Sequence, residues 1–212
     1  ATEVDYRVGQ VVGRRIRAEA WLELGQVQEA RVQMEQALAE ATEIDLTPEM
    51  IASRHGLARL AALRKDASAT EAHVSVARAL AERQDPERYA PALVALKAWA
   101  CAFTGDHDDA ARMLGQVERT LEKLPVPRRC QVMLSAAQAH AALGAAEDAR
   151  RLAGEAAGLA GSRGFRLWDL QARWLLAQVS DDPTASAAWR MEAVERARDL
   201  HDELDLDHRR IY

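Results

Sequence analysis

The residues best suited to chemistry in this sequence are its acidic and histidine side chains, and they lie far apart. The densest group is Asp106-His107-Asp108-Asp109, whose carboxylates could bind a metal ion. Calcium would require a loop of about 12 residues that ends in a bidentate glutamate, and the sequence lacks that loop. A helix start explains the group better, because Asp106 can cap the helix and the next acids favour its dipole. The sequence therefore predicts no metal site.

No arrangement of catalytic residues stands out either. The sequence contains no His-Glu-x-x-His motif and no glycine-rich phosphate loop, and Gly161-Ser162 lacks the pattern of a nucleophile elbow. His140 lies in an apolar stretch, which favours a packed core histidine. Cys101 and Cys130 lack metal-ligand spacing, so we expect small buried side chains in a reducing cytoplasm. We predict that the chain is not an enzyme and binds no cofactor.

The bulk composition narrows the classes of partner. The chain has 212 residues and a formal net charge of −5, and its basic residues are interleaved with acids. This pattern is typical of solvated helix faces and argues against nucleic-acid binding. No apolar run approaches the roughly 18 residues of a membrane span, and no secretion signal is visible. The sequence opens at Ala1 without a methionine, so we expect a fragment of a larger protein.

The spacing of apolar residues predicts ten helices in five antiparallel hairpins. The hairpins are expected at residues 4–44, 47–84, 86–124, 126–160 and 165–204, within a single domain over residues 1–212. Prolines and acids mark several helix starts, as in Asp85-Pro86-Glu87. Gly56 is expected to be a weak point in its helix, at about 1 kcal/mol relative to alanine.

The turn within the first hairpin recurs along the chain. Its sequence is Leu24-Gly25-Gln26-Val27-Gln28-Glu29-Ala30-Arg31. Similar stretches occur at 104–111 and 143–150, and a less similar copy occurs at 66–73. The anchoring alanines are predicted at Ala30, Ala72, Ala110 and Ala149, in steps of 42, 38 and 39 residues. In the second hairpin the residues expected to face inward are Ala72, Val76, Ala79 and Leu80. A fixed period in this range indicates stacked helical hairpins.

Glycine followed by alanine five residues later, and by another alanine after seven more, resembles the tetratricopeptide (TPR) repeat. The first copy has Gly25, Ala30 and Ala37, and the second has Ala67 in place of the turn glycine. The long, alanine-rich copies look like the helical repeat regions of large bacterial signalling ATPases, transcription activators and kinases. The resemblance implies an all-α fold, a right-handed α-solenoid of about five antiparallel hairpins that forms a TPR-like superhelix.

In the resembled family, the first helix of each hairpin lines a concave face. Carried over to this sequence, that register predicts a ligand or peptide site at Arg15, Glu19, Glu23, Arg54, Arg64, Lys65, Trp99, Phe103, Gln131 and Gln138. The basic residues among them could pair with the acidic groups of a peptide, and Trp99 and Phe103 could provide an apolar anchor. The alternative is that the arginines are solvated and the aromatic residues belong to the core.

These features favour a non-enzymatic scaffold that binds a protein or peptide, as the regulatory module of a bacterial signalling or transcription-regulatory protein in the cytoplasm. The alternative is an effector-sensing domain that binds a small molecule within the superhelix. Trp168, Trp174 and Trp189 lie in the last hairpin, where core packing is the default. If they form an exposed patch, a homodimer through this terminal hairpin is expected instead.

Overall fold

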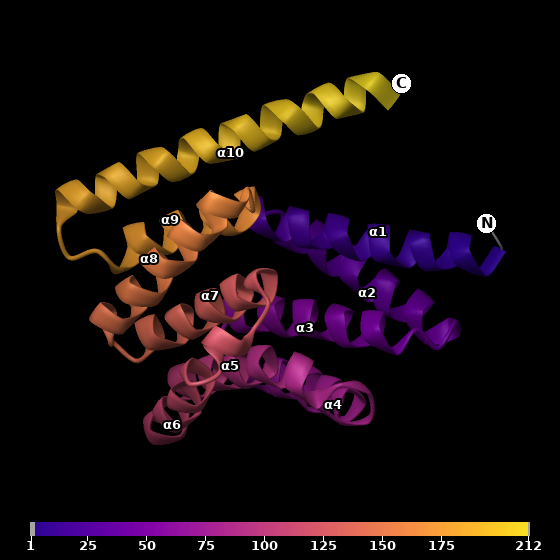
Figure 1. Cartoon of the computed structure of the whole chain (residues 1–212), viewed down its shortest axis with the longest axis horizontal. Coiled ribbons are helices and arrows are strands. Elements are labelled where there is room, and N and C mark those ends of the chain that lie inside the picture. Colours follow the sequence, from indigo (N-terminus) through magenta and orange to yellow (C-terminus); the bar gives the residue numbers. More distant parts are fainter. Residues whose placement is uncertain (1–2, 212) are drawn as a thin grey trace. The chain divides into compact units, whose positions relative to one another are not determined.

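The computed structural model describes the backbone of residues 3–211 and the side chains of residues 6–199. All regular secondary structure in the described residues is helical (Figure 1), which confirms the predicted all-α fold. The helices are α1 Glu3–Glu23, α2 Val27–Glu43, α3 Thr47–Leu63, α4 Ala67–Gln84, α5 Pro86–Thr104, α6 His107–Glu118, the short 3₁₀ helix η1 Leu121–Lys123, α7 Val126–Ala142, α8 Ala146–Arg163, α9 Arg166–Val179 and α10 Pro183–Ile211.

The chain forms two compact units that divide between Thr120 and Leu121. The first unit contains α1 to α6 as three hairpins, in which each helix packs against the next one along the chain. The first helices of successive hairpins also pack together, since α3 contacts both α1 and α5. Each hairpin in this unit therefore packs against its neighbour, which is the arrangement that a helical-repeat protein requires.

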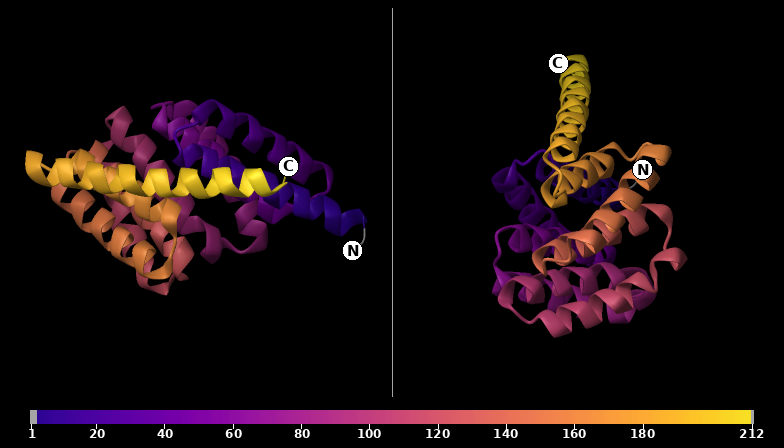
Figure 2. Two further views of the ribbon diagram at one scale, coloured as in Figure 1. Left: turned by 90° about the horizontal axis from the view of Figure 1, so that it is seen from above. Right: turned by 90° about the vertical axis from the view of Figure 1, so that its left-hand side faces the viewer.

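The second unit contains η1 and α7 to α10, and it is built in the same way. Consecutive helices pack together, and α7 also contacts α9, the first helix of the next hairpin. With 29 residues against 14, α10 is about twice as long as α9 and extends past its end (Figure 2). Both units thus consist of stacked antiparallel hairpins. The prediction that all five hairpins act as a single domain stays a prediction.

Small, fully buried residues recur at matching positions in the first four hairpins. In the first helices these alanines are Ala18, Ala58, Ala98 and Ala137, each with 0% exposure. In the second helices the matching residues are Ala30, Thr70, Ala110 and Ala149, which are also fully buried. The second set recurs in steps of 40, 40 and 39 residues. Small side chains at these positions allow the helices to approach closely.

The predicted inward face of the second hairpin was wrong by two residues. Ala72, Val76 and Ala79 are exposed and Leu80 is half-buried. The buried residues of α4 are instead Thr70, Val74, Ala77 and Ala81. These residues lie 40 positions after Ala30, Met34, Ala37 and Ala41, the buried residues of α2. The repeat is therefore more regular than the sequence pattern had indicated.

The cause of this error is the turn between α3 and α4, where Lys65 and not Ala67 takes the place of the turn glycine. Lys65 has φ +58°, and the glycines at the other turns, Gly25, Gly105 and Gly144, have φ between +77° and +89°. All four turns close with the same backbone hydrogen bond, such as Gln26 N–H to the Trp21 carbonyl at 2.9 Å and Asp66 N–H to the Ala61 carbonyl at 3.0 Å. This is the Schellman bond, in which a left-handed residue ends the helix.

We expect Lys65→Gly to stabilise the first unit by about 1 kcal/mol, because a side chain in the left-handed region is strained by roughly that amount. The reverse exchange, Gly25→Lys, should destabilise it by a similar amount. Urea unfolding followed by circular dichroism measures both changes. Equal stability of Lys65→Gly and the parent chain would show that the turn at Lys65 carries no strain.

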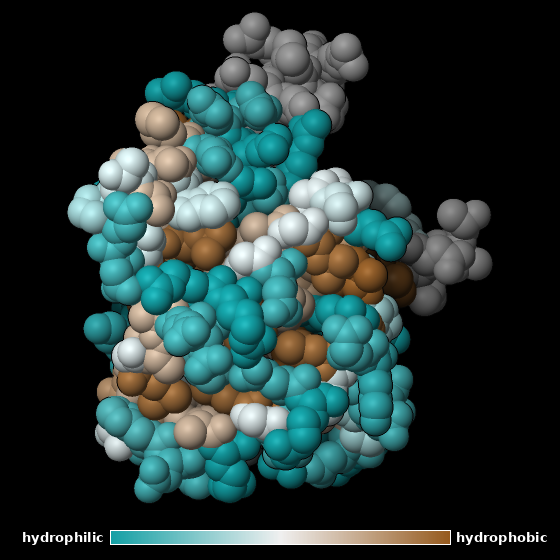
Figure 3. Space-filling model, turned by 60° about the vertical axis from the view of Figure 1, so that its left-hand side comes forward, coloured by the Kyte–Doolittle hydropathy of each residue, from teal (hydrophilic) through white to brown (hydrophobic). Residues whose placement is uncertain are grey.

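The face of the molecule shown in Figure 3 is mainly hydrophilic. On the face shown in Figure 3, hydrophobic residues form separate patches among hydrophilic ones. Large apolar side chains with substantial exposure in the first unit include Tyr6 (66%), Ile16 (52%) and Val76 (41%). Among the described residues, no helix combines the length and the hydropathy needed to cross a bilayer.

Candidate functional site

The ten residues predicted to bind a ligand are divided between the two units. The first unit holds Arg15, Glu19, Glu23, Arg54, Arg64, Lys65, Trp99 and Phe103, and α7 of the second unit holds Gln131 and Gln138. Their local surroundings differ widely, and four of them, Arg15, Glu19, Glu23 and Gln131, have hydrogen-bond or ion-pair partners within the chain. The environment of each residue therefore decides which ones could receive an external ligand.

Arg15 and Glu19 belong to an ion-pair network that joins α1 to α3. The Arg15 guanidinium contacts Glu19 at 2.8 Å and Glu49 of α3 at 2.5 Å. Burial by itself would lower the pKa of Arg15, but the two carboxylates raise it overall. The positive charge of Arg15 is thus balanced within the chain.

Glu23 also has an internal partner. Its carboxylate accepts a hydrogen bond from Arg59 of α3 at 2.9 Å, and both side chains are only 7% exposed. The pair joins the C-terminal end of α1 to α3. This contact makes Glu23 a structural residue of the first unit.

The remaining predicted residues of the first unit vary in exposure. Arg64 and Lys65 are exposed at the turn after α3. Trp99 is only 8% exposed, and Phe103 is half-buried. Exposure therefore favours Arg64 and Lys65 as ligand-binding candidates, whereas the burial of Trp99 favours the alternative that this aromatic residue belongs to the core.

In the second unit, Gln131 and Gln138 lie on the same helix but have different surroundings. The side-chain oxygen of Gln131 accepts a hydrogen bond from Arg128 at 3.2 Å. The Oε1 atom of Gln138 is buried and has no hydrogen-bond partner. Both side chains are half-buried, so Gln138 has the greater unused capacity for hydrogen bonding.

Arg54 differs from the other charged residues of the predicted site because it is half-buried and its charge is not balanced. Its side chain is half-buried, and within the described residues it forms no hydrogen bond or ion pair. Its Nε atom is buried without an acceptor. Burial lowers the pKa of the guanidinium, because a charged group loses hydration there. A buried donor without a partner is unfavourable, and an external acceptor would relieve this cost.

His73 of α4 is the neighbour of Arg54 that the sequence analysis missed. Its Nδ1 atom is buried without a hydrogen-bond partner. Burial lowers the pKa of His73, and the positive charges of Arg54 and Arg31 lower it further, against an opposing effect of Glu35. In the corrected register His73 is the counterpart of Gln33, so the 40-residue repeat could have identified it. Arg54 and His73 together form the candidate functional site.

The lowered pKa of His73 predicts a pH dependence of folding. The unfolded chain takes up this proton near the usual histidine pKa, about 6.5, and the folded chain does so only at lower pH. The contribution of neutral His73 to stability is therefore present above pH 6.5 or so and is lost as the pH falls below it. His73→Gln should lose less stability than the parent chain between pH 7 and pH 5 or so, as measured by urea unfolding. Equal losses of stability in His73→Gln and the parent chain would contradict the lowered pKa of His73.

The other polar groups that the sequence singled out do not form a second site. Asp106 precedes α6, but its side chain makes no capping hydrogen bond, so the predicted cap is wrong. Asp109 pairs with Arg112 at 2.6 Å. In the part of the chain that the structure describes, no group of three or more potential ligands could hold a metal ion. Cys101 is half-buried and Cys130 is buried, both are free, and burial raises the pKa of each thiol.

Comparison with known proteins gives similarity of structure alone. No protein-family model matches the sequence, and no curated protein matches it. The similar solved structures include two that are described as a kinesin light chain from Podosopora anserina with nearly identical TPR-like repeats. One of them, a single-residue variant, is 21% identical, with a TM-score of 0.49 over 94% of this chain and 97% of the other. The second is also 21% identical, with a TM-score of 0.49 over 92% and 96%.

Proposed function

We propose that the chain is a non-enzymatic scaffold that binds other proteins, and that it serves as a regulatory module. The observation that carries this proposal is an uncovered face on α1. The equivalent face of each later first helix in the same unit is buried against the hairpin that precedes it. An exposed copy of a helix-packing face is suited to bind a helical segment from outside the given residues, and in this proposal a partner protein supplies that segment.

The buried copy of this face is clearest on α3. Leu57 and Leu60 of α3 belong to the hydrophobic cluster that also contains Leu22 of α1 and Met34 of α2. Gly56, one residue before Leu57, lies directly against the Met34 side chain. On α5 the equivalents of Gly56 and Leu60 are Leu96 and Ala100, which are 0% and 5% exposed. Both later helices thus bury the first and last of these positions, whereas the counterpart of Leu57 on α5 is Lys97, which pairs with Glu71 of α4 at 3.0 Å.

On α1 the same positions are occupied by Ile16, Arg17 and Ala20. Ile16 is 52% exposed, Arg17 is exposed and Ala20 is half-buried. Gly9 and Gly13 precede them at helical spacing, and a Cβ atom at either glycine would meet no other atom within 4 Å. The face is therefore open, and apart from Arg17 it consists of glycines and apolar residues, which suits packing with another helix.

Substitution of Ile16 tests this proposal. Ile16→Glu should leave the fold intact, because the side chain is exposed, and should abolish binding of the partner, because a charge then enters the apolar contact. The matched control is Val32→Glu on α2, where Val32 is 40% exposed. Partners captured by the parent chain and by Val32→Glu would be purified, and their affinity measured by calorimetry. Equal affinity of Ile16→Glu would remove this face from the interface.

The last hairpin supports a second contact, with another copy of the same chain. Ala187, Met191 and Val194 form an exposed apolar stripe on α10, and Met191 is 66% exposed. Trp174 of α9 is 49% exposed, which differs from the core packing expected for it. Sedimentation of the parent chain and of Met191→Glu tests whether this hairpin forms a homodimer. A bacterial source and a cytoplasmic location are part of the same proposal and come from the sequence resemblance.

A further inference from the structure

Two arginines occupy equivalent positions in the first two hairpins, and the described residues provide an acidic partner for only one of them. Arg14 of α1 and Arg54 of α3 are 40 residues apart, which is the repeat length in this unit. The buried residues on either side agree with this match, since Val11 and Ile51 are 2% and 1% exposed and Ala18 and Ala58 are both fully buried. The two arginines can therefore be compared directly.

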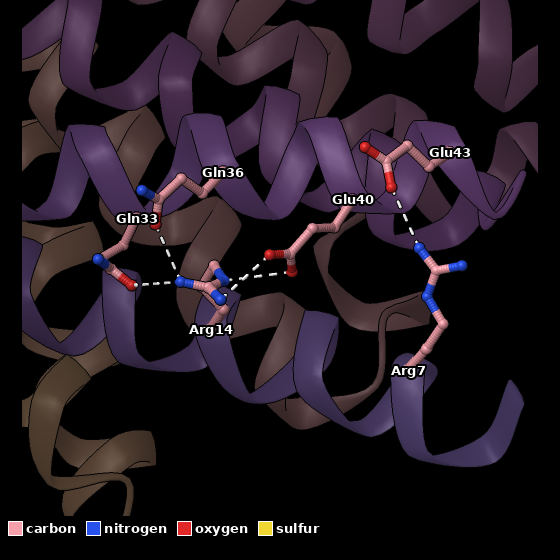
Figure 4. A network of polar contacts seen from close by, with 6 residues as sticks. All are labelled: Arg7, Arg14, Gln33, Gln36, Glu40 and Glu43. Atoms are coloured by element: carbon pink, nitrogen blue, oxygen red, sulfur yellow. Dashed lines mark hydrogen bonds and ion pairs between the residues drawn. The ribbon is translucent and has the colours of Figure 1, made fainter. Parts of the chain in front are cut away.

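All three guanidinium nitrogens of Arg14 contact side chains of α2 (Figure 4). Its guanidinium contacts both carboxylate oxygens of Glu40, at 3.1 and 3.2 Å. It also donates hydrogen bonds to the side-chain oxygens of Gln33 at 3.3 Å and Gln36 at 2.9 Å. One carboxylate and two amide oxygens thus surround this arginine in the first hairpin.

In the second hairpin the three partner positions carry other residues. The counterparts of Gln33, Gln36 and Glu40 on α4 are His73, Val76 and Leu80. The last two of these counterparts are apolar, so neither offers a side-chain acceptor for Arg54. The Nε of Arg54 and the Nδ1 of His73 are both buried without a hydrogen-bond partner. The second hairpin therefore keeps the arginine and lacks its acid.

The charges around Arg54 indicate what could fill this place. Arg31 of α2 is already paired with Glu35 at 2.8 Å, and the lowered pKa of His73 keeps its imidazole neutral near pH 7. Among the described charges that act on His73, one positive charge is left without a partner, that of Arg54. A guanidinium binds a carboxylate through two parallel hydrogen bonds. A dianionic phosphate would leave part of its charge unbalanced in this half-buried position.

We propose that Arg54 and His73 form a binding site for a single carboxylate, supplied by an acidic side chain of a partner protein. The external carboxylate takes the position at Arg54 that Glu40 takes at Arg14. Val76, which is 41% exposed, offers an apolar contact to the methylene groups of that side chain. The source of the carboxylate rests on the proposed protein-binding function, but the site itself can be tested without any partner.

Acetate is the probe for this test. The Nε–H resonance of Arg54, which is assigned by its loss in Arg54→Gln, is followed by NMR during a titration with sodium acetate. The added sodium acetate replaces an equal concentration of sodium chloride, so the ionic strength stays constant. The expected result is a saturating shift. The His73 imidazole resonance should move with the same apparent affinity and should lose its response to acetate in Arg54→Gln. Shifts without saturation at both groups would overturn the proposal.

Two variants separate this site from general surface charge. Leu80→Glu places a carboxylate at the position of Glu40, so it should compete with acetate and weaken binding by about tenfold or more. Arg14→Gln removes an arginine whose partners are internal, and it should leave acetate binding unchanged. Equal binding by Leu80→Glu and the parent chain would contradict the repeat argument. If Leu80→Glu does not fold, the His73 response in Arg54→Gln decides the question.

Phosphate and pH provide the last two comparisons. Inorganic phosphate should bind more weakly than acetate near pH 7, and tighter phosphate binding would overturn the assignment to a carboxylate. Acetate should bind more tightly as the pH falls below about 6.5, because His73 then gains a proton beside Arg54 while Glu35 stays paired with Arg31. If Ile16→Glu loses partner binding but still binds acetate normally, the α1 face fails independently of the carboxylate site at Arg54 and His73, and the two proposals are tested separately.

Discussion

Glu23→Ala should destabilise the first unit by about 3 kcal/mol, which is near the lower end of the range for breaking one side of a buried ion pair. Glu23 and Arg59 are 2.9 Å apart and only 7% exposed. Without the carboxylate, the guanidinium of Arg59 remains buried but loses this partner. The free-energy cost of removing Arg59 from water is then less well compensated. Urea unfolding followed by circular dichroism measures the change in the free energy of unfolding.

A double variant and a surface control make this prediction specific. Glu23→Leu combined with Arg59→Met removes both charges and should recover most of the loss, because apolar residues of similar volume often replace a buried pair without loss of stability. The control is Glu43→Ala, which breaks an exposed pair with Arg7 (Figure 4). This exposed pair should contribute less than about 1 kcal/mol. Equal effects of Glu23→Ala and Glu43→Ala would show that burial does not strengthen the inner pair.

The helices and their order could be predicted from the sequence because their signals are local. Gly25, Gly105 and Gly144 mark turns by residue type, and each of them adopts the left-handed conformation that favours glycine. The turn at Lys65 has no such mark, because residue type does not show that a lysine accepts positive φ. The prediction therefore placed the second turn two residues late, and the inward face of α4 moved with it.

The same error explains what could be predicted of the candidate site. Arg54 was selected from the sequence, but as a residue of a concave face and without His73. With the repeat of 40 residues, Arg54 is the counterpart of Arg14, which faces α2. The sequence comparison of Glu40 with Leu80 then shows that the acid is missing. A correct register would therefore have made the unbalanced arginine visible, although its burial could come only from the structure.

Gly56 was identified from the sequence, but its role was not. The sequence indicated only a weak point in the helix, whereas the structure shows a packing contact. A glycine inside a helix is unfavourable relative to alanine by about 1 kcal/mol in propensity. In the structure, a Cβ atom at Gly56 would lie 2.3 Å from Cε and 3.0 Å from Sδ of Met34. Met34 is fully buried, so its side chain has little space into which it could move. The Met34 side chain thus occupies the space that a side chain at position 56 would fill.

This arrangement predicts that Gly56→Leu destabilises the first unit by about 3 kcal/mol, at the upper end for overpacking of a core. Met34→Ala alone should also destabilise it, by about 2–5 kcal/mol, because it leaves a cavity.

The double variant exchanges the large and small residues across the contact between α2 and α3 and roughly conserves the volume. It should therefore be much more stable than the sum of the two single effects implies. The four free energies of unfolding form a double-mutant cycle. Additive losses would show that Met34 and Gly56 do not share one space. A favourable coupling would show that adjacent hairpins are fitted together by the pairing of a long side chain with a glycine, in addition to the small residues at each crossing.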